Sequence, residues 1–159
     1  ATLAQRTMTP YTVTPIGHVE SPVTKQTDAD WGQVTARVVL EPAYRPGLQG
    51  LADFSHVLVV TLLHQAAFDT ARHLVRRPRG LATMPEVGIF AQRAKDRPNP
   101  LGITVVPLLE VTAEGLVVRG LDAIDGTPVL DVKPYYPHYD RAESPRVPEW
   151  VDRLMRDYF

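Results

Sequence analysis

The sequence predicts a mainly β protein, a single-domain β-barrel of about seven short strands with one or two short helices. The first observation is the composition of its 159 residues, 44% hydrophobic and 22% charged, which is typical of one folded domain. The second is that fifteen prolines and ten glycines divide the chain into short segments. The third is that these segments are rich in Val, Ile, Leu and Thr, and short strands joined by turns favour a barrel or a sandwich.

Seven segments carry the strand pattern. In chain order they are residues 12–19, 33–40, 55–63, 87–90, 102–111, 116–121 and 129–132. Two turns are also predicted, one over residues 112–115 and one at Asp125 and Gly126. The first lies between two apolar runs, and in the second the glycine can adopt the positive φ that a tight hairpin turn requires.

The predicted helices cover residues 65–74 and 148–157. Pro148 is suited to the first position of the second helix. Four residues of this helix form one apolar stripe, which we interpret as packing against the core or a second subunit rather than a cofactor site. These are Trp150, Val151, Leu154 and Tyr158. The predicted organisation is an N-terminal arm (1–10), the barrel domain (11–140) and a C-terminal helix on the barrel or a dimer partner (141–159).

The composition excludes several classes of site. The chain has no cysteine, which rules out disulfides, cysteine-ligated zinc, iron–sulfur clusters and a thiol nucleophile. No glycines have G-x-G-x-x-G or Walker spacing, which argues against a Rossmann or P-loop nucleotide site. The five histidines are scattered, so no metal site is predicted. The longest apolar run, about residues 57–63, is far shorter than the roughly 20 residues of a membrane span, and we expect a soluble cytoplasmic protein.

The first segment with chemical potential is residues 88–103. Pro98 and Pro100 flank Asn99 and favour an extended backbone whose amide and carbonyl groups are available to a ligand. Arg93 and Arg97 add guanidinium groups suited to a carboxylate or phosphate. The alternative is a proline-stiffened surface loop with solvated arginines.

The second segment, residues 121–135, contains three carboxylates. Asp122, Asp125 and Asp131 could ligate a metal, act as a general base, or pair with the two arginines. Asp125 is more simply explained as a turn former. Asp131 interrupts an apolar run, so we expect it to be partly buried and to need a cationic partner such as Lys133 or one of the arginines.

A third feature is a pair of histidines around one apolar run. His56 precedes the run, and His64 with Gln65 follows it. His64 therefore lies at the end of a predicted strand, where side chains commonly line the mouth of a pocket. His56 is at least equally well explained as a satisfied core histidine.

Together these segments resemble the TsaA-like (YaeB-like) family, also called tRNA methyltransferase O. The resemblance covers about residues 11–137, and no contact is assigned to the loop 23–33, which departs from the family pattern. The matching residues are Ile16-Gly17, Ser21-Pro22, Gly47-Leu48, Gly50-Leu51, Phe54-Ser55-His56, His64-Gln65, Gly88 to Ala91 with Arg93, Arg97 to Gly102, and Asp122 to Tyr135.

This resemblance implies a β-barrel methyltransferase that binds S-adenosylmethionine outside any Rossmann fold. It implies a homodimer with sites near the subunit interface, and N6-methylation of N6-threonylcarbamoyladenosine beside the anticodon of tRNA. The implied cofactor contacts are His64, Gln65, Arg93, Ile103 (largely through its backbone), Gly120, Leu121 and Asp122.

We assign roles to these residues as hypotheses. Arg93 or Arg97 is expected to meet a carboxylate of the cofactor or of the threonyl group, and Asp122 to contact the adenosine part of the cofactor. An N–H acceptor also benefits from a base, for which His64 and Asp131 are the candidates. The catalytic candidates are therefore His64, Asp131 and Arg97.

Charge is unevenly distributed along the chain. Its formal net charge is −1, but residues 72–97 contain seven basic and two acidic residues, which leaves −6 for the remainder. This segment is the predicted tRNA face, and a solvated charged loop is the alternative. The expected phosphate contacts are Arg76, Arg77, Arg79 and Lys95.

Two other functions stay open. A methyltransferase of the same fold could act on a small molecule or a protein, which the near-neutral net charge favours. A non-catalytic module could instead bind S-adenosylmethionine and sense it. Turnover of the cofactor in the presence of tRNA separates the second possibility from the methyltransferases.

Overall fold

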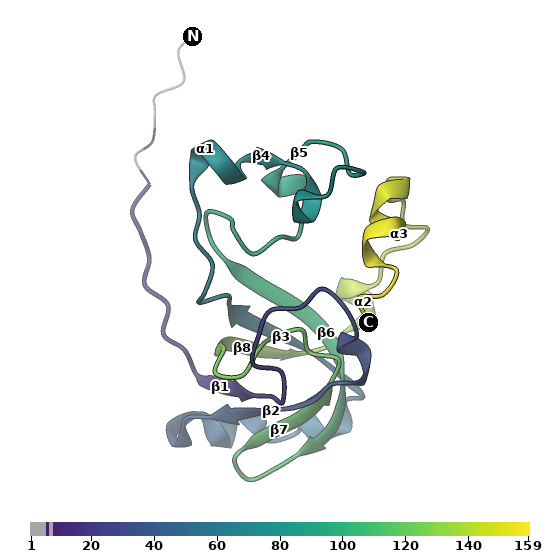
Figure 1. Cartoon of the computed structure of the whole chain (residues 1–159). Coiled ribbons are helices and arrows are strands. Elements are labelled where there is room, and N and C mark those ends of the chain that lie inside the picture. The colour runs from purple at the N-terminus through teal and green to yellow at the C-terminus, as the bar shows by residue number, and fades with distance from the viewer. Residues whose placement is uncertain (1–5, 7) are drawn as a thin grey trace.

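The computed structural model describes residue 6 and residues 8–159. Six antiparallel strands form a closed barrel in the order β1-β2-β7-β6-β3-β8, and β4 and β5 form a separate two-stranded sheet beyond one end of it (Figure 1). The strands are β1 (Gly17–Glu20), β2 (Thr35–Leu40), β3 (His56–Leu62), β4 (Val75–Arg76), β5 (Val87–Gly88), β6 (Leu101–Val111), β7 (Gly115–Arg119) and β8 (Pro128–Pro134).

Short helices connect these strands. The α-helices are α1 (Thr70–His73), α2 (Pro137–Asp140) and α3 (Glu149–Met155). The 3-10 helices are η1 (Trp31–Gln33), η2 (Pro42–Leu48), η3 (Leu51–Asp53), η4 (Pro78–Gly80) and η5 (Ile89–Ala91). Among the described residues, no helix has the length and apolar character needed to cross a membrane.

The barrel interior is built from residues that alternate along each strand. In β3, Val57, Val59 and Thr61 are buried, while the residues between them face outward and are half-buried. This two-residue period places one apolar face inside and one outside. Each fully buried valine contributes about 1.5 to 3 kcal/mol relative to an exposed one, so the valine-rich strands stabilise the closed barrel.

β6 is the longest strand, and its two halves have different neighbours. Residues 101–107 pair with β3, whereas pairing with β7 begins only at Leu108, beside an irregularity between Leu108 and Glu110. Within residue 6 and residues 8–159, the first half of β6 therefore has one edge without a strand partner. This open edge positions the candidate site described below.

The prediction of a mainly β barrel is confirmed, with six strands in the barrel instead of about seven. The predicted hairpin at residues 112–115 is also confirmed, because the Thr112 amide donates to the Gly115 carbonyl at 2.8 Å. Gly126 has the expected positive φ of 82°. The hairpin predicted there is wrong, however, because the turn joins β7 to β8 and these strands are not neighbours.

Other element boundaries differ from the prediction. The first strand begins at Gly17 rather than residue 12, and residues 87–90 contain only the short β5 followed by η5. The predicted helix at 65–74 shrinks to Thr70–His73, and the C-terminal helix to Glu149–Met155. Within the predicted arm, residues 6 and 8–10 are exposed and have no regular structure, and residues 1–5 and 7 lie outside the described residues.

Residues 63–100, which we call the lobe, connect β3 to β6 and lie beyond one end of the barrel (Figure 1). Asp96 organises its interior by accepting from the Ala67 amide at 3.0 Å and pairing with Lys95 at 3.0 Å and His73 at 3.9 Å. Burial acts to raise the pKa of Asp96, but the Ala67 hydrogen bond and the Lys95 charge outweigh it and lower that pKa. The lobe is therefore held by an ionised carboxylate.

Gln92 links the two strands of the lobe. Its side-chain nitrogen donates to the carbonyls of Arg76 at 2.9 Å and Val87 at 3.0 Å, which lie on β4 and β5. The side chain is buried, so these two bonds replace the water that both carbonyls would otherwise bind. Gln92 thus fixes the segment that leads directly into Arg93.

Candidate functional site

Arg93, a predicted site residue, contacts the open edge of β6. The Arg93 side chain donates through Nη2 to the carbonyl oxygen of Ile103 at 2.7 Å. This carbonyl lies in the half of β6 that has no β7 partner, so the guanidinium takes the place of a strand neighbour. Two predicted cofactor residues ten positions apart are therefore in direct contact.

Asp122 contacts Thr104, the residue that follows Ile103 on β6. The Thr104 hydroxyl donates to Asp122 Oδ1 at 2.5 Å, and the Tyr158 hydroxyl donates to Oδ2. Gly120, with φ of 87°, turns the chain after β7, and its amide donates to the Val34 carbonyl at 2.8 Å. The carboxylate is consequently fixed by hydroxyl donors on both oxygens.

Leu121 has a structural position within this motif. Its side chain is 1% exposed and belongs to the core cluster of the barrel. It anchors the turn between Gly120 and Asp122 and leaves Asp122 half-buried at the barrel end. Any contact of Leu121 with a ligand would have to use its backbone.

His64 and Gln65 lie in a turn directly after β3, and both are exposed. The Leu63 amide donates to the Pro100 carbonyl at 2.7 Å, and Leu62 pairs with Leu101. These contacts place the end of β3 beside the start of β6, so the histidine is at the same end of the barrel as the Arg93 and Asp122 contacts. Its role as a base stays a prediction.

The other two catalytic candidates make local contacts. Arg97 donates through Nη1 to the carbonyls of Gln92 at 2.9 Å and Ala94 at 3.3 Å, and so stabilises its own loop. Asp131 lies on β8, is partly buried, and pairs with Lys133 at 3.0 Å. The expected partial burial and cationic partner of Asp131 are confirmed. The catalytic roles of Arg97 and Asp131 stay predictions.

His56 differs from the expected core histidine. It belongs to the outward-facing half of β3 and is half-buried beside the Tyr135 ring, with ring centroids 6.2 Å apart. Its Nδ1 lies 2.7 Å from the Ser55 hydroxyl. The alternation of β3 explains the difference, because the neighbouring Val57 occupies the inward position.

The four predicted phosphate contacts all have intramolecular partners. Lys95 pairs with Asp96 at 3.0 Å, and Arg76 approaches the same carboxylate at 4.0 Å. Arg79 pairs with Asp28 at 3.6 Å, and Arg77 donates to the Met84 carbonyl. The positive charge of this segment is therefore partly committed to the lobe itself.

The sequence missed Thr104 and Tyr158. Thr104 is the polar residue among alternating apolar ones in β6, which was the available signal for an inward hydroxyl. The sequence predicts Tyr158 in an apolar stripe, yet its hydroxyl reaches Asp122. Its ring meets the neighbouring Phe159 ring at a 4.8 Å centroid distance, and Tyr158 lies beyond the end of α3.

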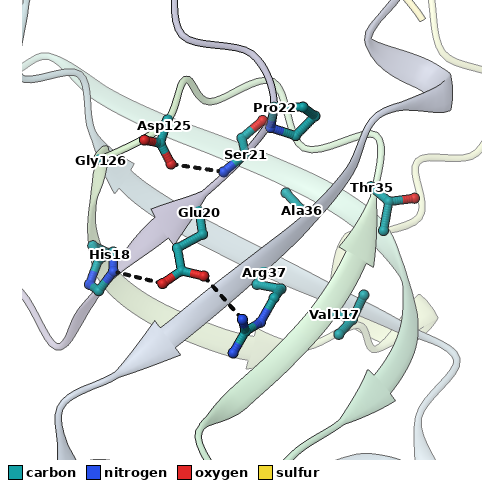
Figure 2. Close-up of a pocket in the computed structure, with 10 residues that line it drawn as sticks. All are labelled: His18, Glu20, Ser21, Pro22, Thr35, Ala36, Arg37, Val117, Asp125 and Gly126. Atoms are coloured by element: carbon teal, nitrogen blue, oxygen red, sulfur yellow. Dashed lines mark hydrogen bonds and ion pairs between the residues drawn. The ribbon is translucent and has the colours of Figure 1, made fainter.

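A groove of about 730 Å³ lies elsewhere, on the outer face of β1, β2 and β7 (Figure 2). Its charged side chains face one another: Glu20 pairs with Arg37 at 3.2 Å and with His18 at 3.6 Å. At its end, the Ser21 amide donates to Asp125 Oδ1 at 3.0 Å. The Glu20–Arg37 pair fastens β1 to β2, and the Ser21–Asp125 bond fastens the end of β1 to the turn before β8, which explains the Ser21 and Asp125 motifs structurally.

Comparison with known proteins supplies the family. The profile of the tRNA-methyltransferase O N-terminal domain matches residues 19–141. A probable S-adenosyl-L-methionine-binding protein of Pyrococcus abyssi is 35% identical over 149 residues, covering 87% of this chain and 75% of that protein. The mouse tRNA (adenine(37)-N6)-methyltransferase is 37% identical over 97 residues, which are 61% of this chain and 22% of the mouse protein.

The fold agrees with the same family. The crystal structure of TrmO from Pseudomonas aeruginosa superposes with a TM-score of 0.74 at 30% identity. The match covers 92% of this chain and 64% of that one, so the chain spans under two thirds of that structure. The profile match and the barrel together show that this chain belongs to the tRNA-methyltransferase O family.

Proposed function

We propose that the chain transfers the methyl group of S-adenosylmethionine to N6 of adenosine 37 in tRNA, where this adenosine carries a threonylcarbamoyl group. The family membership and the names of the relatives support this reaction. The observation that carries it is that Arg93 and Asp122 bind adjacent residues of β6. Arg93 binds the Ile103 carbonyl, and Asp122 binds the Thr104 hydroxyl. A cationic and an anionic side chain thereby flank one short stretch of exposed strand.

The side chains at this end of the barrel fit the chemistry of S-adenosylmethionine. The guanidinium of Arg93 uses Nη2 for Ile103 and retains further N–H donors for a carboxylate. Each Asp122 oxygen accepts one hydroxyl and retains capacity for the hydroxyl groups of a ribose.

When bound, S-adenosylmethionine supplies a methyl group already activated by the sulfonium. The chain therefore has to bind, orient and exclude water, and orientation alone can lower the barrier by about 7 to 11 kcal/mol. Arg93 would hold a carboxylate and Asp122 the adenosine part. His64 would accept the N6 proton at a ring nitrogen, with Asp131 as the other candidate base.

We also propose a homodimer. Leu101, Ile103 and Val105 are between 43% and 49% exposed and follow one another on the outer face of β6. Val60 of β3 pairs with Ile103 and continues this apolar strip. An exposed apolar strip beside a candidate site supports burial against a second copy.

A methylation assay tests the proposed function. The chain is incubated with S-adenosylmethionine and tRNA that lacks this methylation. The tRNA is then digested to nucleosides, and their masses are measured by mass spectrometry. We expect threonylcarbamoyladenosine to gain the mass of one CH₂ group. Arg93→Ala should strongly reduce this gain, whereas Arg146→Ala, which alters an exposed arginine outside the lobe, should preserve it.

A small-molecule or protein acceptor is the second candidate, because Arg76, Arg79 and Lys95 are engaged in intramolecular ion pairs. Cofactor binding without any change in the tRNA nucleosides would contradict a tRNA acceptor and favour this second candidate. Absence of cofactor binding would contradict both.

A further inference from the structure

The C-terminal residues are fastened beside Asp122. The amides of Asp30 and Trp31 donate to the carbonyls of Asp157 and Tyr158, both at 2.8 Å. Trp31 is 1% exposed, so the loop that receives the C-terminal segment is itself anchored in the interior. A Cβ at Gly32 would lie 2.7 Å from the Phe159 carbonyl carbon, which shows how closely the two segments approach.

The Tyr158 side chain uses its two parts differently. Its ring lies beneath the Arg79 guanidinium at 5.8 Å and meets the Phe159 ring edge-on. A phenylalanine could make both of these ring contacts. Only the hydroxyl requires tyrosine, and the hydroxyl donates to Asp122 Oδ2.

Asp122 consequently has two hydroxyl donors from distant parts of the chain. Thr104 on β6 fixes Oδ1, and Tyr158 fixes Oδ2. Two donors on different oxygens determine the rotation of a carboxylate, which a single donor does not. Hydrogen bonds to a charged acceptor are also stronger than those between neutral groups.

We propose that Tyr158 is a positioning residue, whose hydroxyl, together with that of Thr104, orients the Asp122 carboxylate toward the adenosine part of S-adenosylmethionine. The C-terminal segment 157–159 is then part of the cofactor site. This inference rests on the proposed function. It assigns a role to a residue outside the matched domain, which ends at residue 141.

The chemistry of Tyr158 agrees with a donor and not with a base. Burial, followed by the neighbouring charge of Asp122, raises the pKa of Tyr158 far above its usual value. The hydroxyl therefore keeps its proton at physiological pH. A protonated phenol can orient a carboxylate but cannot remove the proton from an acceptor nitrogen.

The test compares cofactor binding by calorimetry in the absence of tRNA. Tyr158→Phe keeps the ring and removes the hydroxyl, so we expect the Kd for S-adenosylmethionine to rise on the order of tenfold. Tyr139→Phe, at a tyrosine 84% exposed, is the matched control and should leave the Kd unchanged. Thermal unfolding of each variant shows whether the fold is retained.

A second pair of variants gives an independent route. Thr104→Val removes the other hydroxyl and should also weaken binding, whereas Thr104→Ser retains a hydroxyl and should restore it. In the Asp122→Asn background, adding Tyr158→Phe should change the Kd much less than it does in the natural chain. This non-additivity is expected for a residue that acts through Asp122 and not for one that only packs.

The outcomes separate this inference from the proposed function. If the natural chain binds S-adenosylmethionine and folded Tyr158→Phe binds it equally well, the positioning role is wrong and the proposed function stands. If Tyr158→Phe does not fold, the Thr104→Val variant decides. Equal affinity of Thr104→Val and the natural chain for S-adenosylmethionine would then overturn the positioning role. If the natural chain does not bind the cofactor, the proposed function fails and this inference fails with it.

Discussion

Arg93 donates to the carbonyl oxygen of Ile103 at 2.7 Å, at the point where β6 has no β7 neighbour. A side chain from the lobe thus completes the hydrogen bonding of a barrel strand. The same contact places a guanidinium beside the exposed Ile103 side chain. The proposed cofactor site is therefore assembled from the lobe and the barrel together.

The first prediction concerns Arg93. Arg93→Ala should weaken S-adenosylmethionine binding by at least about tenfold, because it removes the proposed partner of a carboxylate. Arg93→Lys should rescue only part of the affinity, since lysine retains the charge but not the planar fork. Calorimetry measures both, with Arg146→Ala as the control. Unchanged affinity in Arg93→Ala would remove this residue from the proposed site.

The second prediction concerns Asp96, which is shielded inside the lobe. Asp96→Asn should lower the free energy of unfolding at neutral pH by about 1 to 3 kcal/mol, because it removes a charged acceptor from Ala67, Lys95 and His73. Asp53→Asn, at an exposed aspartate, is the control. Urea unfolding of both variants measures the difference.

The effect of Asp96 should depend on pH. Its folded-state pKa is lowered from 3.8, so its stabilisation is complete above that value and is lost as the pH falls through the lower folded-state pKa. The natural chain and Asp96→Asn should therefore become more alike in strongly acidic solution. A difference that stays constant across this range would contradict an ionised Asp96.

The third prediction concerns the approach of β7 to β2. A Cβ on Gly115 would lie 1.8 Å from the Val38 carbonyl oxygen, so Gly115→Ala must separate the two strands. We expect a loss of about 2 to 4 kcal/mol in the free energy of unfolding. Gly47→Ala, where nothing lies within 4 Å of the new Cβ, should have little effect. Similar stability of the two variants would exclude the close approach.

The fourth prediction concerns the dimer. Val105→Lys places a charge in the apolar strip of β6 and should convert a dimer into a 17.7 kDa monomer. Light scattering after gel filtration measures the mass. Val147→Lys, at a valine 52% exposed outside the barrel, is the matched control. A natural chain that is monomeric at every concentration would contradict the proposed assembly.

The fifth prediction concerns tRNA. If Arg76 and Arg77 contact phosphates, replacing each by alanine should weaken tRNA binding and reduce its dependence on salt by about one charge per residue. Arg141→Ala, an exposed arginine outside the lobe, should have no such effect. The affinity of each variant for tRNA, measured across a series of salt concentrations, tests this prediction. Equal salt dependence in all variants would show that the lobe arginines serve only the lobe.

Some features could be predicted because neighbouring residues decide them. The hairpin at residues 112–115 is a local turn between two adjacent apolar runs, and the Asp131 pair with Lys133 involves residues two apart. The predicted helix at 65–74 was too long because distant groups compete for its backbone. The Ala67 amide binds Asp96, and Asp69 caps the helix at Ala71 instead of continuing it.

The sequence by itself determined the barrel class, most of its strands, and the segments that carry Arg93 and Asp122. Periodicity and turn chemistry are local properties, so they can be recognised without coordinates. Only the tertiary structure decided which side chains meet. Tyr158 contacts Asp122 although 36 residues separate them in the sequence. Closure of the barrel likewise decides that β7 pairs with only part of β6. Such contacts depend on packing between distant segments, which no local pattern of residues encodes.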